Sequence, residues 1–140
     1  MYLDTCAWCR PFDDPSNQRI LQESNAIAEI FRRVDARELE IIGSSILLAE
    51  ISMITPKIKE ETVLSLVRHV TNSFAVATNT IERLAAELMQ ACTIDAMDAL
   101  HIAVAIENKA EVFITTDDII LNKAECILRY KITIRNPCEV

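Results

Sequence analysis

Short apolar runs alternate along the chain with longer stretches in which apolar residues recur every three or four positions. The short runs are typical of buried strands, and the longer stretches are typical of helices that bury one face. This alternation predicts strands at 1–6, 39–42, 112–114 and 132–134, and a short extended piece at 74–77. It predicts helices at about 15–35, 46–54, 56–69, 80–89, 95–108 and 117–128.

Turn and capping residues support several of these boundaries. Asp14 followed by Pro15 is typical of a helix start, with proline at the first helical position. The segment 43–45, Gly-Ser-Ser, predicts a turn and a helix N-cap. Because strands alternate with helices, we expect an α/β fold: a three-layer α/β/α sandwich around a central parallel sheet of four to five strands.

Length and composition indicate one soluble globular domain over residues 1–140. The chain is 51% hydrophobic and 25% charged, with one glycine and no internal repeat. Its longest uncharged apolar runs are far shorter than a membrane span. Asp4 follows the first three residues without a basic region, so we expect no signal peptide, no membrane association and a cytoplasmic location.

Cysteine count and net charge narrow the functional classes. The five cysteines are irregularly spaced and odd in number, and we expect most of them to be reduced packing residues. The net charge of −7 argues against a protein that coats nucleic acid with a broad basic surface. It is compatible with a nuclease whose acidic cluster is neutralised by bound cations.

Two acidic residues follow predicted strands. Asp4 ends the first strand, and Asp117 comes just after the strand at 112–114. Ligands of open parallel sheets bind beyond the carboxyl ends of the strands. Both carboxylates are therefore expected at the ligand-binding edge.

Two further acids lie in apolar helices. Glu50 has only apolar immediate neighbours, and Asp98 lies in the helix that is apolar nearly all round. A carboxylate removed from water is costly unless it is paired or binds a metal, and no lysine or arginine lies one helical turn from either acid. Each acid taken alone could instead face solvent or pair with a distant arginine. Together, oxygen ligands without imidazole or thiolate favour Mg²⁺ or Mn²⁺ over zinc.

Several neighbours of these acids have two interpretations. Asp118 and Asp95 could support the site as outer acids, or could simply be acids favoured at a helix start by the helix dipole. Thr115 and Thr116 could bond the carboxylates, although capping the next helix is the commoner role. For His101 we expect a buried side chain satisfied by a backbone or carboxylate partner rather than a metal ligand.

The sequence resembles the PIN domain family. The resemblance rests on the first segment Tyr2-Leu3-Asp4-Thr5, on the isolated Glu50, and on three later segments: Met97-Asp98-Ala99-Leu100-His101-Ile102-Ala103, Phe113-Ile114-Thr115-Thr116-Asp117-Asp118 and Ile132-Thr133-Ile134-Arg135-Asn136-Pro137. These segments run from the first residue nearly to the last, in the order and at the spacings of that family. Individually they are weak signals; together they are fairly specific.

The resemblance implies a Mg²⁺- or Mn²⁺-dependent endonuclease that hydrolyses RNA. It assigns Asp4, Glu50, Asp98 and Asp117 to the site, with the three aspartates holding the cation and Glu50 completing the shell or orienting the attacking water. Members of this length resemble the VapC-like toxins of type II toxin–antitoxin pairs. Such a protein is expected to be a homodimer held by a small antitoxin.

Cys6 departs from the family pattern, in which a small polar residue often stands two places after the first aspartate. It also creates the motif Cys6-Ala7-Trp8-Cys9, which is typical of a redox dithiol or half of a zinc site. No second cysteine pair has spacing suited to zinc, and Pro11 and Pro15 are expected to delay the helix that a redox motif requires.

A third possibility is a PIN-like module that binds partners without cleaving RNA. Intact acids argue against it, while the scarcity of basic residues near them keeps it open. The candidates for phosphate contact, each of which could equally be a solvated surface charge, are Arg10, Lys57, Lys59 and Lys123.

Overall fold

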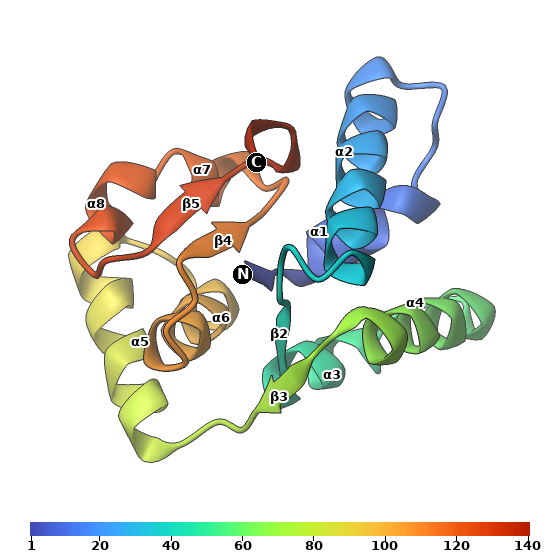
Figure 1. The fold of residues 1–140 in the computed structure, drawn as a ribbon. Coiled ribbons are helices and arrows are strands. Elements are labelled where there is room, and N and C mark those ends of the chain that lie inside the picture. Colours follow the sequence, from blue (N-terminus) through green and yellow to red (C-terminus); the bar gives the residue numbers. More distant parts are fainter.

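A computed structural model describes all 140 residues, and a five-stranded parallel sheet lies at its centre (Figure 1). The strand order is β3-β2-β1-β4-β5, and every neighbouring pair is parallel. The strands are β1 (Tyr2–Leu3), β2 (Ile42–Ser44), β3 (Ser73–Ala75), β4 (Val112–Ile114) and β5 (Thr133–Arg135). The predicted α/β/α fold with a parallel sheet is confirmed.

Helices connect the strands and cover both faces of the sheet. Those before β3 are α1 (Thr5–Cys9), the 3₁₀ turn η1 (Arg10–Phe12), α2 (Gln18–Asp35), α3 (Ser45–Ile51) and α4 (Lys57–Val70). Those after β3 are α5 (Asn79–Cys92), α6 (Ala96–Glu107), α7 (Asp118–Leu121), α8 (Ala124–Leu128) and the 3₁₀ turn η2 (Pro137–Glu139). Figure 1 shows α2 and α4 on one side of the molecule and α5, α6 and α8 on the other.

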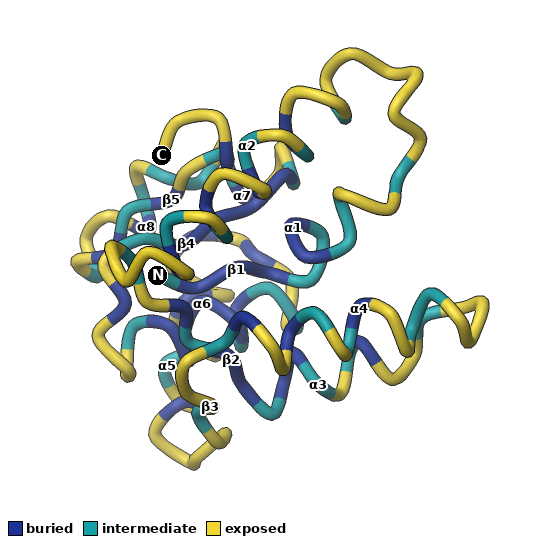
Figure 2. Tube along the Cα trace, turned by 45° about the vertical axis from the view of Figure 1, so that its right-hand side comes forward, coloured by how far each residue is buried: buried dark blue, intermediate teal, exposed yellow.

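Alternation along the strands divides the core into two clusters, one for each face of the sheet. Tyr2 and Phe113 pack with α5 and α6, while Leu3 and Ile114 pack with α1, α2, α3 and α4. All four side chains are fully buried. Figure 2 shows that β1 and α1 form the buried centre, whereas the outer turns of α2 and α4 are exposed.

The strand order places a crevice between β1 and β4. From β1 the chain builds the sheet in one direction, through β2 to β3, and later adds β4 and β5 on the other side of β1. This reversal lies at the boundary of β1 and β4, where ligands of open α/β sheets bind beyond the carboxyl ends of the strands.

Two predicted boundaries near the N-terminus are wrong. The first strand ends at Leu3 rather than at residue 6, because Asp4 caps a helix that starts at Thr5. The next helix begins at Gln18 rather than at Pro15, because Asn17 provides its cap by accepting a hydrogen bond from the Ile20 amide at 3.2 Å. A side-chain cap therefore decides the start in both cases.

Two later boundaries also differ. The second strand covers 42–44 instead of 39–42, and the helix predicted at 117–128 is two short helices, α7 and α8, separated by Asn122 and Lys123. The other predicted helices and strands occur within a few residues of their expected positions.

Gly43 lies inside β2 instead of forming a turn. A Cβ atom at this position would lie 2.8 Å from the Phe74 ring on the neighbouring strand β3, so any larger residue would force that ring to move. Ser44 does cap α3 as predicted, and its Oγ accepts a hydrogen bond from the Leu47 amide at 3.0 Å.

A disulfide corrects the expectation for two of the five cysteines. Cys92 at the end of α5 is joined to Cys126 in α8, and Cys6, Cys9 and Cys138 are free. The two residues are 34 positions apart, so their pairing was not visible from local spacing. The bond ties α8, which precedes β5, to the helix layer beside it.

We expect Cys126→Ser to lower the free energy of unfolding by about 2 kcal/mol, because the bond restricts a long loop of the unfolded chain. Urea denaturation measures this loss. Cys138→Ser, which removes an exposed free thiol, is the matched control and should leave the midpoint unchanged. An equal midpoint for wild-type protein with and without reductant would contradict the prediction.

No single helix is long and apolar enough to cross a bilayer. By length and composition alone, α5 and α6 together would be, although they are bent by 119° at their junction.

Candidate functional site

Asp4 lies at the carboxyl end of β1 and is nearly buried, with 6% of its surface exposed. Its Oδ1 accepts hydrogen bonds from the Cys6 thiol at 2.8 Å and from the Ala7 amide at 3.0 Å. Its Oδ2 accepts one from the Thr115 hydroxyl at 2.5 Å. Burial raises the pKa of Asp4, and these hydrogen bonds to the ionised form offset part of that rise.

Thr115 and Asp117 follow the adjacent strand β4. The buried Thr115 hydroxyl donates to Asp4 and accepts a hydrogen bond from the Asp117 amide at 3.0 Å. Asp117 is half-buried and caps α7, and its Oδ1 accepts from the Ile119 amide at 2.8 Å. Thr115 therefore links the two strand-end aspartates, and the expectation that it caps the next helix is wrong.

Asp98 lies in the first turn of α6 and is half-buried. Its pKa is raised to about 7, chiefly by burial. The negative charges of Asp95, Asp117 and Asp4 contribute to that rise. Asp95 is exposed and caps α6 by accepting a hydrogen bond from the Asp98 amide at 3.2 Å. Asp98 is therefore near enough to Asp4 and Asp117, which follow β1 and β4, for their charges to act on it; these three aspartates are called the acidic edge.

Glu50 lies near the end of α3 and has its own partners. Its Oε1 accepts a hydrogen bond from the Thr5 hydroxyl at 2.6 Å and contacts Nε2 of the buried His101. The His101 contact and the Thr5 hydrogen bond hold the pKa of Glu50 below its usual value, against the effect of burial. His101 therefore has a carboxylate partner, as the sequence led us to expect.

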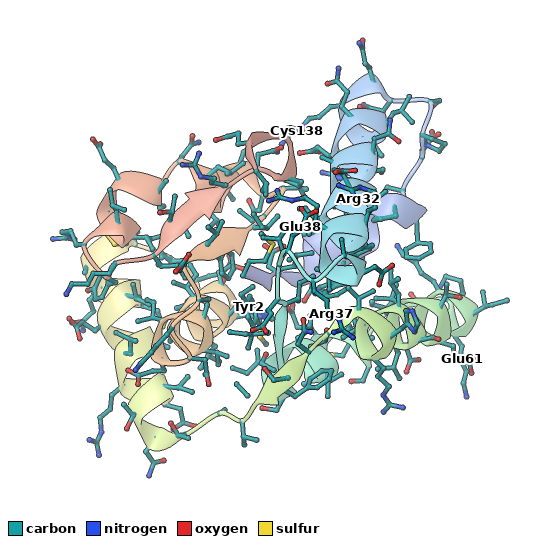
Figure 3. All side chains as sticks on the ribbon, viewed as in Figure 1. Tyr2, Arg32, Arg37, Glu38, Glu61 and Cys138 are labelled. Carbon is teal, nitrogen blue, oxygen red and sulfur yellow. A yellow bond between two sulfur atoms is a disulfide. The ribbon has the colours of Figure 1, made fainter.

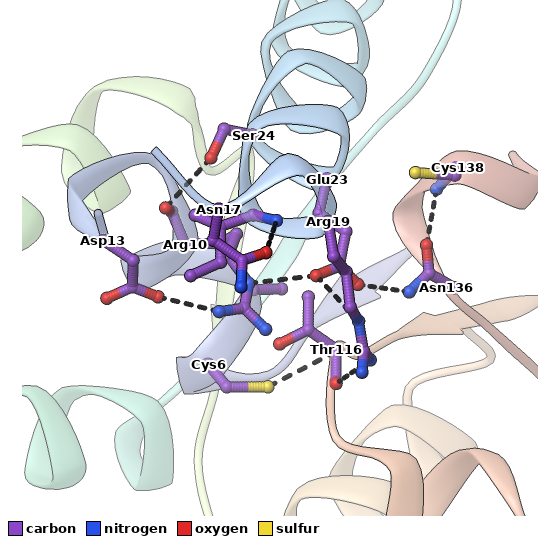
Figure 4. Close-up of polar contacts among 12 residues, drawn as sticks. Cys6, Arg10, Asp13, Asn17, Arg19, Glu23, Ser24, Thr116, Asn136 and Cys138 are labelled. Carbon is purple, nitrogen blue, oxygen red and sulfur yellow. Dashed lines mark hydrogen bonds and ion pairs between the residues drawn. The ribbon is translucent and has the colours of Figure 1, made fainter. Parts of the chain in front are cut away.

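Asp118 does not belong to this cluster. It is exposed, and both of its carboxylate oxygens accept hydrogen bonds from Arg19 at 2.9 Å, which lower the pKa of Asp118. Arg19 also donates to the Thr116 carbonyl at 3.1 Å (Figure 4). Thr116 is buried, and its amide donates to the Cys6 sulfur at 3.4 Å, so it neither bonds a site carboxylate nor caps α7.

The chemistry of the acidic edge fits a hard divalent cation. None of Asp4, Asp98 and Asp117 forms an ion pair with lysine or arginine. No lysine or arginine therefore neutralises their charges, and carboxylate oxygens are preferred ligands of Mg²⁺. In the arrangement described here, no three acidic, histidine or cysteine side chains are close enough to coordinate one ion.

The CxxC motif does not have the properties of a redox dithiol. Cys6 and Cys9 are not bonded to each other, and burial beside Asp4 raises the pKa of Cys6 to about 12. A reactive thiol needs a lowered pKa. The expected delay of the helix is wrong, however, because α1 spans the whole motif. The raised pKa, rather than the helix position, now argues against redox chemistry.

The acidic edge is not a closed cavity. The largest hollow, about 520 Å³, lies elsewhere, between Phe12 and α4 residues that include Ile58 and Leu66.

Of the basic residues considered for phosphate contact, Arg10 forms ion pairs with Asp13 at 3.1 Å and with Glu23 at 3.2 Å. No lysine or arginine forms an ion pair with any of the four candidate site acids.

The contacts of Thr5, Cys6 and Arg19 were not anticipated from the sequence. Thr5 and Cys6 directly follow Asp4, and a helix that starts there turns both side chains back toward the carboxylates. An N-cap role for Asp4, which its residue type allows, would have predicted these two contacts from the sequence. Arg19 lies 99 residues from Asp118, and nothing local in the sequence indicates their pairing.

Comparisons with known proteins agree with this fold. Among solved structures, the crystal structure of FitAcB from Neisseria gonorrhoeae is similar, with a TM-score of 0.61 and 14% identity over 99% of both chains. This likeness shows the fold alone. Comparison with curated proteins gave no match. The sequence matches the PIN domain over residues 1–125, a family whose members are generally nucleases that use divalent metal ions. The chain belongs to the PIN domain family.

Proposed function

We propose that this chain is a Mg²⁺- or Mn²⁺-dependent endoribonuclease whose site comprises Asp4, Asp98, Asp117 and Glu50. The observation that carries the proposal is the acidic edge at the β1–β4 crevice, where burial and neighbouring carboxylates raise the pKa of Asp98 to about 7 and no cationic side chain compensates them. Such a group of acids is stable as a set of anions only when a cation binds.

The three aspartates would hold the cation directly or through water, and the cation would supply charge neutralisation at the phosphoryl oxygens and a lowered pKa for bound water. Thr115 keeps the Asp4 carboxylate in place and, through the Asp117 amide, fixes the spacing of the two strand ends. Glu50, held by Thr5 and His101, would complete the shell of the cation or orient the attacking water. In-line attack would leave a 5′-phosphate and a 3′-hydroxyl.

The biological setting that we propose follows from the resemblance to VapC-like proteins. In that setting the chain is a cytoplasmic toxin that acts as a homodimer and is held by a small antitoxin. An open acidic edge, rather than a closed pocket, suits a polymeric substrate such as single-stranded or structured RNA. The alternative, a binding module without cleavage, is favoured only by the scarcity of basic residues near the acids.

We expect wild-type protein to cleave a fluorescent single-stranded RNA in Mg²⁺ or Mn²⁺ and to lose this activity in EDTA. Asp117→Asn should lower the rate by roughly 100-fold, because it removes one charge from the cation site while retaining the α7 cap.

Asp118→Asn is the matched control, because it makes the same change at the next residue, where the carboxylate serves Arg19. Its rate should stay within about threefold of wild type, since an exposed ion pair contributes little. Metal binding without cleavage of any RNA tested would favour the non-cleaving module, and cleavage that survives EDTA and Asp117→Asn would exclude the proposed site.

A further inference from the structure

We propose that His101 is a positioning residue that, together with Tyr2 and Ser44, fixes the orientation of Glu50. This inference rests on the proposed function, because it assigns the histidine a role in the cleavage site rather than in packing alone. The supporting observation is a continuous line of side-chain hydrogen bonds. This line begins at Ser44, the N-cap of α3, and ends at the carboxylate of Glu50 on the same helix.

The line joins residues of four elements: β1, β2, α6 and α3. The Tyr2 hydroxyl lies 2.7 Å from Ser44 Oγ and 2.6 Å from His101 Nδ1, and His101 Nε2 contacts Glu50 Oε1. Tyr2, Ser44 and His101 are each at most 1% exposed. Figure 3 shows Tyr2 near the centre of the molecule, between β2 and α6. A buried line of polar groups without free partners has little freedom to rearrange.

One assignment of donors satisfies every bond in this line and directs each of them toward Glu50. Ser44 Oγ already accepts the Leu47 amide hydrogen, so its own hydrogen is free to go to Tyr2. Tyr2 then donates to Nδ1 of His101, which leaves Nε2 as the protonated nitrogen that faces Glu50. An ionised carboxylate only accepts hydrogen bonds. With Glu50 ionised, Nε2 carries a hydrogen, and the neutral histidine that the proposal places here is the Nε2–H tautomer.

The placement of these residues connects the line to the other acids. His101 lies one helical turn after Asp98 on α6, and Tyr2 lies two residues before Asp4 on β1. Glu50 is otherwise held only by Thr5, at 2.6 Å. Glutamate has large rotamer freedom, and fixing a catalytic carboxylate in advance lowers the entropic cost of reaching the reactive geometry.

The test is a double-mutant cycle between His101→Gln and Glu50→Gln, with RNA cleavage and Mn²⁺ affinity as separate measurements. We expect His101→Gln to lower kcat by roughly 10-fold, with little change in KM, and to weaken Mn²⁺ binding several-fold. In the Glu50→Gln background the same histidine change should have almost no further effect on either quantity, because the carboxylate that it orients is gone.

Two further variants keep the test informative if His101→Gln folds poorly. Tyr2→Phe removes only the hydroxyl and keeps the ring stacked on Phe113, so a smaller loss of kcat, roughly threefold, is expected. His69→Gln changes the other histidine of the chain, which is exposed on α4, and should leave kcat unchanged. ¹⁵N NMR of the imidazole should show the Nε2–H tautomer of His101 in wild-type protein.

Additive losses in the cycle, or an Nδ1–H tautomer, would overturn the proposal and leave His101 as a packing residue. If wild-type protein cleaves no RNA, the proposed function fails, and the positioning role is still decided by the Mn²⁺ cycle and the tautomer. A loss of Mn²⁺ affinity that is the same with and without the Glu50 carboxylate would count against it in that case too.

Discussion

Asp98→Asn is expected to lower kcat for RNA cleavage by roughly 1000-fold, a loss of about 4 kcal/mol of transition-state stabilisation. The substitution keeps the size of the side chain and the Asp95 cap of α6. It removes a carboxylate whose pKa burial raises to about 7, with the negative charges of Asp95, Asp117 and Asp4 adding to that rise. Single-turnover cleavage in saturating Mn²⁺ measures the loss.

The same variant should be more stable than wild type in the absence of metal. The pKa of Asp98 is about 7 in the folded protein and lower in the unfolded chain, so folding is favoured by protonation. Its unfavourable contribution appears as pH rises from about 4 to 7 and is complete above the folded pKa. We expect Asp98→Asn to be stabilised at pH 8 by roughly 1 kcal/mol, since water screens a half-exposed carboxylate.

Urea denaturation in EDTA at pH 5 and at pH 8 checks this sign, and the gain should shrink at pH 5. Asp118→Asn is the control, because Arg19 lowers the pKa of Asp118 and its neutralisation cannot relieve repulsion. A variant that loses both cleavage and stability at pH 8 would indicate damage to the fold. Unchanged cleavage would remove Asp98 from the site.

The general fold was predictable because its strands and helices have different apolar periodicities. Val112–Ile114 is a strand in both the prediction and the structure, and the buried helix at 95–108 differs by one residue at each end. The two errors near the N-terminus lie where side-chain caps compete with proline or with apolar runs, at Asp4 and Asn17. Capping depends on local hydrogen bonds that apolar periodicity does not report.

The site was predictable only in part. Asp4 and Asp117 follow strands, so topology places them at one edge, and this much follows from the order of elements. The contact between Glu50 and His101 joins residues 51 positions apart, and no local pattern reports it. Asp118 stands next to Asp117 in the sequence, and no local pattern separates the two aspartates. Asp118 lies outside the cluster because it pairs with the distant Arg19.

Glu23 is the residue whose importance is least visible in the sequence. It lies among polar residues of α2 and resembles a surface glutamate, yet only 1% of it is exposed. Its carboxylate lies 3.2 Å from Arg10 Nε and 3.4 Å from Arg19 Nε, and Asn136 donates to it (Figure 4). It thereby joins α2 to η1 and to the chain beyond β5.

We expect Glu23→Ala to lower the free energy of unfolding by about 3–5 kcal/mol, because it leaves two guanidinium groups without their shared buried anion. Cleavage should also fall, though less than in Asp98→Asn, since Arg19 connects this cluster to Thr116 and Asp118 beside the site. Urea denaturation and the RNA assay on the same preparation measure the two effects.

Glu29→Ala is the matched control on the same helix. Glu29 is exposed and pairs with Arg32 at 2.7 Å three residues along, so its loss should cost no more than about 0.5 kcal/mol. If the two variants were equally stable, the buried ion cluster would contribute no more than an exposed pair, because Arg10 and Arg19 would be satisfied by Asp13 and Asp118 alone. A large difference would show that the buried carboxylate holds α2 against the strand ends where the acids lie.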